Sequence, residues 1–150
     1  MPGSIGRRRP PNTPPARPRV LVVDGHQDTR EMYAAALPHF GFETVIADDA
    51  ARAVERARAT HPDVIVTEVA FPKHDGFRLL DDLKRDEWTR EIPVIVVTSL
   101  AESAVRERAD RAGCAAVLVK PCLPEDLAHV VRTVLAPPQP SSLDTKPLVG

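Results

Sequence analysis

Residues 63–68 read Asp-Val-Ile-Val-Thr-Glu, a short and mostly β-branched apolar run that ends on an acidic side chain. Four further runs of this kind occur along the chain: Val20–Val23, Thr44–Ile46, Val94–Val97 and Ala115–Val119. Short apolar runs bounded by polar residues, Gly or Pro are typical of fully buried parallel strands. The sequence therefore predicts five such strands.

Helical periodicity appears between the predicted strands. The clearest stripe follows the fifth run and consists of Leu127, Val130, Val131, Val134 and Leu135. Their spacing places all five on one face of a helix. Strands that alternate with helices of this length indicate βαβ units, which bury a parallel sheet between two helical layers. We expect a single α/β domain with a doubly wound (βα)5 architecture.

The residues directly after the predicted strands carry polar chemistry. They are Asp24, Glu68, Thr98 and Lys120. In open parallel sheets, ligands and chemistry gather outside the carboxyl ends of the strands. We therefore expect two carboxylates, a hydroxyl and an ammonium group to point into one shallow pocket.

Four segments around these strand ends have a distinctive amino-acid sequence and occur in a distinctive order. They are Val20–Asp24, Glu68–Gly76, Val97–Ser99 and Val119–Pro121, the last containing a Lys-Pro pair. Together they resemble the receiver domain of two-component response regulators over residues 19–136. The resemblance implies a flavodoxin-like receiver fold with five parallel strands in the order 2-1-3-4-5.

The resemblance also implies a chemistry for the pocket. In that family an aspartate after the third strand accepts a phosphoryl group from a histidine kinase, and acidic residues hold Mg2+ beside it. By this likeness Glu68 stands in the phospho-acceptor position, and Thr98 and Lys120 belong to the phosphoryl pocket. The metal position falls on Asp24, Glu68 and Ala70.

Three residues depart from the family's pattern at positions that are functional in the family. Glu68 replaces the acceptor aspartate, and Gly25 replaces the second member of the usual acidic pair. Val117 occupies the switch position in the fifth strand, where the family usually has an aromatic residue. We expect any Mg2+ binding to be weak, because the carboxylate at position 25 is missing. Val117 is interpreted as a residue of the strand core.

Glu68 decides between two functional readings. Its extra methylene carries the carboxylate about 1.5 Å further from the backbone than an aspartate's, which disfavours in-line phosphoryl transfer. The same reach brings a permanent negative charge toward Thr98 and Lys120, in partial imitation of an aspartyl phosphate. The alternative is that Glu68 simply pairs with Lys120 and stabilises the fold.

Three local features carry structural predictions. Pro38 lies inside an otherwise helical stretch and is expected to end or kink the first helix. Ser99 and Glu102 have the spacing of a capping box, which places the start of the fourth helix at Ser99. Trp88 is expected to close the core or an edge of it.

Composition divides the chain into a core and two tails. Ten of the 16 prolines lie in residues 1–18 and 137–150, which predicts two extended or disordered tails flanking a receiver domain at 19–136. Residues 1–19 carry five arginines and no acid, whereas residues 20–136 carry 14 basic and 20 acidic side chains. An acidic core argues against specific DNA binding by the folded domain. The function of the Arg-rich tail is left open.

The sequence predicts a stand-alone, divergent receiver domain, or pseudo-receiver, in bacterial phosphorelay signalling. We expect a cytoplasmic protein without a membrane span, because no run approaches the roughly 20 apolar residues that a span needs. It should not be an enzyme and should act through protein contacts with a sensor histidine kinase or a downstream signalling protein, homodimerisation being a further option. One alternative is a receiver that is still phosphorylated with Mg2+. Another is a flavodoxin-like nucleotide or flavin binder.

Overall fold

The computed structural model describes residues 17–70 and 76–137. Five parallel strands form one sheet in the order β2-β1-β3-β4-β5. The strands are β1 (Arg19–Val23), β2 (Glu43–Ala47), β3 (Val64–Thr67), β4 (Val94–Thr98) and β5 (Ala116–Val119). The predicted (βα)5 class and the strand order 2-1-3-4-5 are confirmed.

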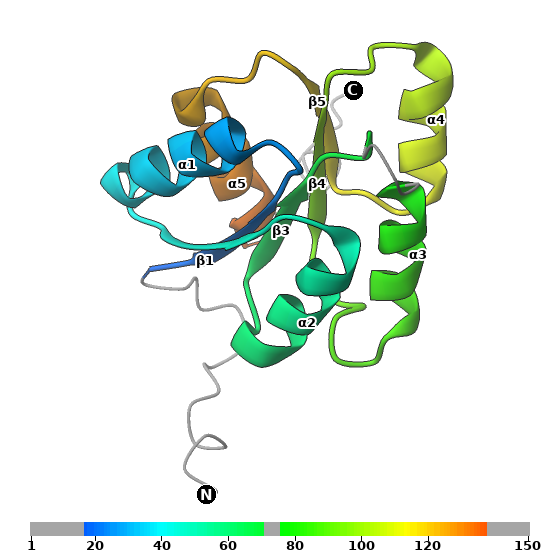
Figure 1. Ribbon diagram of the computed structural model, residues 1–150, viewed down its shortest axis with the longest axis horizontal. Coiled ribbons are helices and arrows are strands. Elements are labelled where there is room, and N and C mark those ends of the chain that lie inside the picture. The colour runs from blue at the N-terminus through cyan, green and yellow to red at the C-terminus, as the bar shows by residue number, and fades with distance from the viewer. Residues whose placement is uncertain (1–16, 71–75, 138–150) are drawn as a thin grey trace, which may run out of the picture.

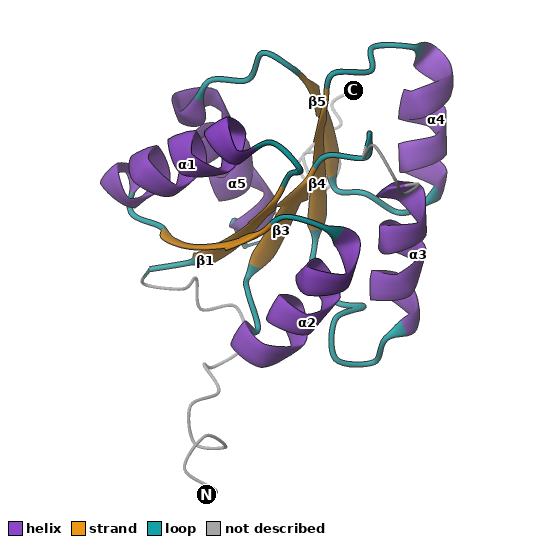
Figure 2. Cartoon of the chain, viewed as in Figure 1, coloured by secondary structure: helices purple, strands orange, loops and turns teal. Residues whose placement is uncertain are grey.

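Helices cover both faces of this sheet (Figure 1). They are α1 (Gln27–Ala36), α2 (Ala50–Thr60), α3 (Gly76–Arg85), α4 (Ser103–Arg111) and α5 (Pro124–Leu135), with a short 3-10 helix, η2 (Leu37–Phe40), after α1. Helices α1 and α5 pack on one face, and α2, α3 and α4 pack on the other (Figure 2). The chain therefore forms the three layers expected of a doubly wound sheet.

The core is divided by the alternation of side chains along each strand. In β1, Leu21 and Val23 join the cluster beneath α2, α3 and α4, whereas Val20 and Val22 join the cluster beneath α1 and α5. All four are at most 1% exposed. Successive strand residues point to opposite faces, so a strand covered on both sides must be apolar throughout. This requirement produces the continuous apolar runs of the sequence.

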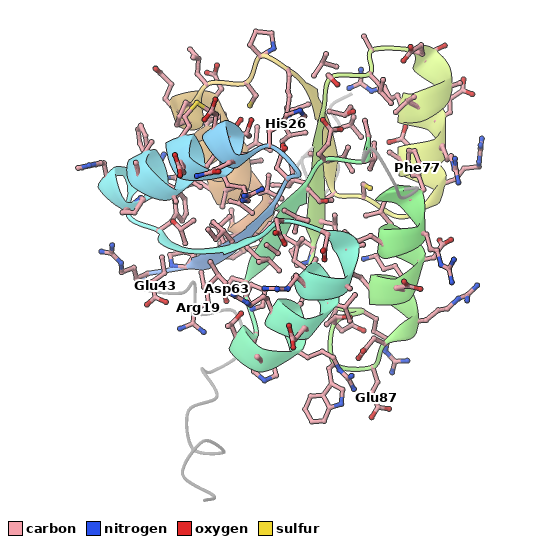
Figure 3. All side chains as sticks on the ribbon, in the orientation of Figure 1. Arg19, His26, Glu43, Asp63, Phe77 and Glu87 are labelled. Carbon is pink, nitrogen blue, oxygen red and sulfur yellow. The ribbon has the colours of Figure 1, made fainter. Side chains whose placement is uncertain are left out.

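Two ends of the sheet are chemically distinct. At the amino end of β1, the Arg19 guanidinium pairs with Glu43 at 2.8 Å and its backbone N–H donates to Asp63 (Figure 3). At the carboxyl end, His26 marks the turn from β1 into α1. The parallel register aligns Val23 with both Ala47 and Thr67. Residues that follow the strands therefore meet at one edge.

Some local predictions were right and others were wrong. Helix α1 ends at Ala36, just before Pro38, as predicted. Pro38 itself lies in the 3-10 helix η2 that follows. The fourth helix begins at Ser103 rather than Ser99, because residue 99 is drawn into the pocket described below. Trp88 closes no core: it is 59% exposed, with its ring 6.2 Å from that of His61.

Predictions for residues 71–75 and for the two tails, apart from residues 17, 18 and 137, lie outside the described residues. Within residues 17–70 and 76–137 no helix is both long and apolar enough to cross a membrane.

Candidate functional site

Four predicted residues meet at the carboxyl edge of the sheet. Asp24, Glu68 and Thr98 are each at most 3% exposed, and Lys120 reaches them from the end of β5. The Lys120 ammonium lies 2.8 Å from Asp24 Oδ2 and 3.3 Å from Glu68 Oε1. One cation therefore bridges two buried carboxylates.

Glu68 is held by donors from two loops. Its Oε2 accepts the backbone N–H groups of Val69 at 2.8 Å and Ala70 at 3.0 Å. Its Oε1 accepts the N–H of Ser99 at 3.3 Å and lies beside Lys120. Three backbone amides and an ammonium group around two oxygens form a complete anion-binding nest. The glutamate carboxylate thus fills an anion site that its own chain supplies.

Asp24 is fixed by the start of α1. Its Oδ1 accepts the backbone N–H of His26 at 2.9 Å and lies 3.2 Å from the His26 ring. Arg30 donates to the Asp24 carbonyl oxygen at 2.8 Å. Sequence reasoning missed both contacts, because they depend on how the chain turns between β1 and α1.

Lys120 carries an altered pKa. Burial alone would lower it, but the hydrogen bond and charge of Asp24, together with those of Glu68, outweigh burial and raise the Lys120 pKa above its ordinary value of 10.5. The side chain is only 20% exposed. The ammonium form is therefore an integral part of the folded pocket at neutral pH.

The remaining predicted positions lie close by. The Thr98 hydroxyl oxygen accepts the N–H of Leu100 at 3.1 Å, which engages it with the chain after β4. Val117 is half-buried and packs against the core beneath α2, α3 and α4. Ala70 contributes its backbone N–H to Glu68.

The described residues of the pocket fit Mg2+ poorly. This cation prefers octahedral oxygen ligands and usually retains several waters. Here both carboxylates are engaged by N–H donors and by the Lys120 ammonium, and Gly25 offers no side-chain oxygen. No three His, Cys, Asp or Glu side chains within residues 17–70 and 76–137 are grouped so that they could hold a metal ion.

A five-stranded parallel α/β domain with two carboxylates, a hydroxyl and a lysine at its strand ends is the arrangement of a receiver-type signalling domain. The sequence model of the family described as "Response regulator receiver domain" matches residues 20–132. The chain therefore belongs to the response regulator receiver family.

Curated relatives agree with this assignment. The chain is 31% identical over 126 residues to the phosphate regulon transcriptional regulatory protein PhoB of Escherichia coli, covering 84% of this chain and 55% of that protein. It thus spans about half the length of the PhoB relatives it matches. It is 32% identical over 116 residues to the polar-differentiation response regulator DivK of Brucella ovis, covering 77% of this chain and 94% of DivK.

Solved structures share the fold. The chemotaxis response regulator CheY4 of Vibrio cholerae superposes with a TM-score of 0.73 at 27% identity, covering 79% of this chain and 99% of CheY4. A response regulator from Desulfuromonas acetoxidans superposes with a TM-score of 0.71 at 30% identity, covering 78% of this chain and 95% of that one.

Proposed function

We propose that this receiver domain signals through protein contacts without phosphorylation of an acceptor aspartate. Glu68 supplies a permanent anion where the family places a transient one. The observation that carries the proposal is the nest around its carboxylate, with N–H donors from Val69, Ala70 and Ser99 and the ammonium of Lys120. The same kinds of donor stabilise a phosphoryl group during transfer.

Glu68 imitates the phosphorylated state only in part. A carboxylate has one negative charge and two acceptor oxygens, whereas a phosphate monoester carries about −1.5 to −2 and three. The two oxygens of Glu68 nevertheless join the loop after β3 to the loop after β4. We expect the domain to hold one conformation of these loops rather than to switch between two.

Phosphoryl transfer to Glu68 is disfavoured by its geometry. The acceptor oxygen of an in-line transfer must be free and placed to within a fraction of an ångström. Both Glu68 oxygens already accept hydrogen bonds, and the side chain is 2% exposed. Weak Mg2+ binding follows from Gly25 and from the Lys120 ammonium beside both carboxylates.

Acetyl phosphate labelling tests the proposal. Incubation of the wild-type chain with acetyl phosphate and Mg2+ should leave its intact mass unchanged. The double variant Gly25→Asp with Glu68→Asp should gain one phosphoryl group, because Asp24, Thr98 and Lys120 remain in place. Stoichiometric labelling of the wild-type chain would overturn the proposal. A double variant that stays unlabelled would show that the pocket differs at further positions.

Two alternative functions predict different results. A receiver that is still phosphorylated would label in the experiment above and require Mg2+. A flavin or nucleotide binder would purify with visible or ultraviolet absorbance from its ligand. We favour neither, because the carboxyl-end pocket is filled by the Lys120 ammonium and the Glu68 carboxylate. We expect no catalytic activity and a cytoplasmic location.

The proposed partner surface is formed by α4, β5 and α5. A sensor histidine kinase, a downstream signalling protein or a second copy of the chain would dock there, and no specific DNA binding is expected. Val119 at the end of β5, one of the two edge strands of the sheet, is 44% exposed. The residues Arg106, Glu107, Asp110 and Arg111 give the exposed side of α4 both signs of charge. The DivK match supports the receiver domain as the acting unit.

Charge reversal on α4 tests this surface. Arg106→Glu with Arg111→Glu should weaken self-association or partner binding about tenfold, because like charges then face their former partners. The melting temperature should change little, since both side chains are exposed. Sedimentation and pull-down measure the first effect and calorimetry the second, with Arg85→Glu and Arg90→Glu as the matched control.

A wild-type association that survives the α4 variant unchanged would contradict this placement. The contact would then move to the surface pocket of about 410 Å3 between α1 and the β5–α5 loop, where Met32 and Leu123 are 42% and 55% exposed.

A further inference from the structure

A second polar pocket opens beside the edge strand β2, between α1 and the first turns of α2. Its volume is about 160 Å3. It is lined by Arg30, Ile46, Ala47, Asp48, Arg52 and Arg56. We call it the arginine pocket. It is separate from the cluster around Glu68, and neither the family resemblance nor the proposed function assigns it a ligand.

Charge in the arginine pocket is unbalanced. Three arginines and one acidic residue, Asp48, line it. Arg52 and Arg56 lie one helical turn apart on α2, so they are neighbours on its surface. Among the described residues neither of these two side chains has an ion pair or hydrogen bond of its own. The positive end of the α2 dipole adds to the field, because Arg52 is in the first turn.

The third arginine is held in place rather than free. Arg30 comes from α1, and one of its Nη groups donates to the carbonyl oxygen of Asp24 at 2.8 Å. A guanidinium has five N–H donors, so this bond leaves others available. The pocket thus combines one anchored cation with two cations that form no ion pair with any described residue. An anion entering it gains attraction without first displacing an internal ion pair of Arg52 or Arg56.

Size and geometry select the class of ligand. Planar guanidinium forks match the oxygens of phosphate and bind them through paired hydrogen bonds. The pocket is smaller than the roughly 300–1,000 Å3 of sites for drug-sized ligands. We propose that the arginine pocket binds a phosphate dianion, either inorganic phosphate or the phosphate group of a small phosphomonoester.

Backbone contacts join the arginine pocket to the first site. The Asp24 N–H donates to the carbonyl oxygen of Ala47, which lines the pocket, at 3.2 Å. Arg30 binds the Asp24 carbonyl oxygen from the other side. Two residues that line the arginine pocket, Ala47 and Arg30, are therefore hydrogen-bonded to the backbone of Asp24, whose carboxylate binds Lys120. The proposal does not depend on whether Glu68 is phosphorylated.

Titration with sodium phosphate at pH 8 and constant ionic strength tests the proposal by 1H–15N NMR. We expect saturable shifts at the amides of Ala47, Asp48, Arg52 and Arg56. The variant Arg52→Gln with Arg56→Gln should weaken binding by about tenfold or more, because two of the three guanidinium groups are lost. The control Arg85→Gln with Arg90→Gln removes two exposed arginines elsewhere and should bind as the wild type does.

Three results would overturn the site: shifts that do not saturate, shifts spread over arginines throughout the chain, or equal affinity in the two double variants. Glycerol 1-phosphate under the same conditions identifies the source of the phosphate. Tighter binding than inorganic phosphate identifies a phosphomonoester as the ligand. Weaker binding identifies the free anion, and binding of neither compound refutes the proposal.

Discussion

Replacing Lys120 with methionine is expected to lower the free energy of unfolding by about 3–5 kcal/mol, the cost of breaking a buried ion pair from one side. Methionine keeps much of the length of the side chain and removes its charge. Asp24 and Glu68, whose side chains are 5% and 2% exposed, would then remain buried without a counter-ion. Urea unfolding measures the loss. Lys84→Met, which removes a more exposed ammonium, should cost about 0.5 kcal/mol or less.

A double-mutant cycle measures how much of the cost of Lys120→Met comes from its interaction with Glu68 rather than with Asp24. In a Glu68→Gln background, Lys120→Met should be less costly, with a coupling of about 0.5–3 kcal/mol. A coupling near zero would show that Lys120 acts through Asp24 alone. A cost below about 1 kcal/mol for Lys120→Met itself, as for an exposed pair, would contradict the buried bridge.

Alkaline pH should reduce the difference in unfolding free energy between the wild-type chain and Lys120→Met. A raised pKa means that the folded state holds the Lys120 proton more tightly than the unfolded state does, so the resulting stabilisation is fully present below the ordinary pKa of 10.5. It is lost as the pH rises through the raised value. The stability gap between wild type and Lys120→Met should therefore narrow above about pH 10.5. A gap that stays constant to pH 12 would contradict the assignment.

Gly76→Ala is expected to destabilise the domain by about 1–3 kcal/mol through overpacking. A Cβ built at this position would lie 2.5 Å from the Val69 carbonyl oxygen and would also collide with the rest of that residue's backbone. The Gly76 N–H donates to the same oxygen at 3.1 Å, so the two chain segments cannot separate cheaply. Thermal and urea unfolding would report the loss.

The sign of the Gly76 effect is informative. Helix propensity alone favours alanine over glycine by up to about 1 kcal/mol, so a stabilised variant would show that no close approach exists. Ser103→Ala provides the control, because Ser103 is the exposed first residue of α4 and should tolerate the change within about 0.5 kcal/mol.

The sequence predicted the fold well because a parallel sheet covered on both faces produces runs of consecutive apolar residues in the sequence. Each central strand of such a sheet must be apolar on both sides, and the runs at Val64–Thr67 and Val94–Thr98 are buried at every position. The prediction of full burial was wrong for β2 and β5, which lie at the edges of the sheet and are partly exposed. The meeting of Asp24, Glu68 and Lys120 was predictable as well, since parallel strands end at one edge. Strand ends are fixed by the sheet and need no knowledge of loops.

The parts that depend on loop conformation could not be predicted. Three backbone amides bind Glu68, and nothing in the side-chain sequence indicates the direction of a backbone N–H. Ser99 had the spacing of a helix cap, but its N–H serves the pocket and α4 begins four residues later. The arginine pocket was missed because Arg30 and Arg52 come from two helices and share no motif.

Beryllofluoride binding followed by 1H–15N NMR tests the central claim most directly, because this anion mimics a phosphoryl group on an acceptor aspartate. With Mg2+ and beryllofluoride, the wild-type amides of Val69, Ala70 and Ser99 should not move, since the Glu68 carboxylate already occupies their donors. The same amides should shift in the Gly25→Asp, Glu68→Asp double variant. Saturable shifts at these three amides in the wild-type chain would contradict the account.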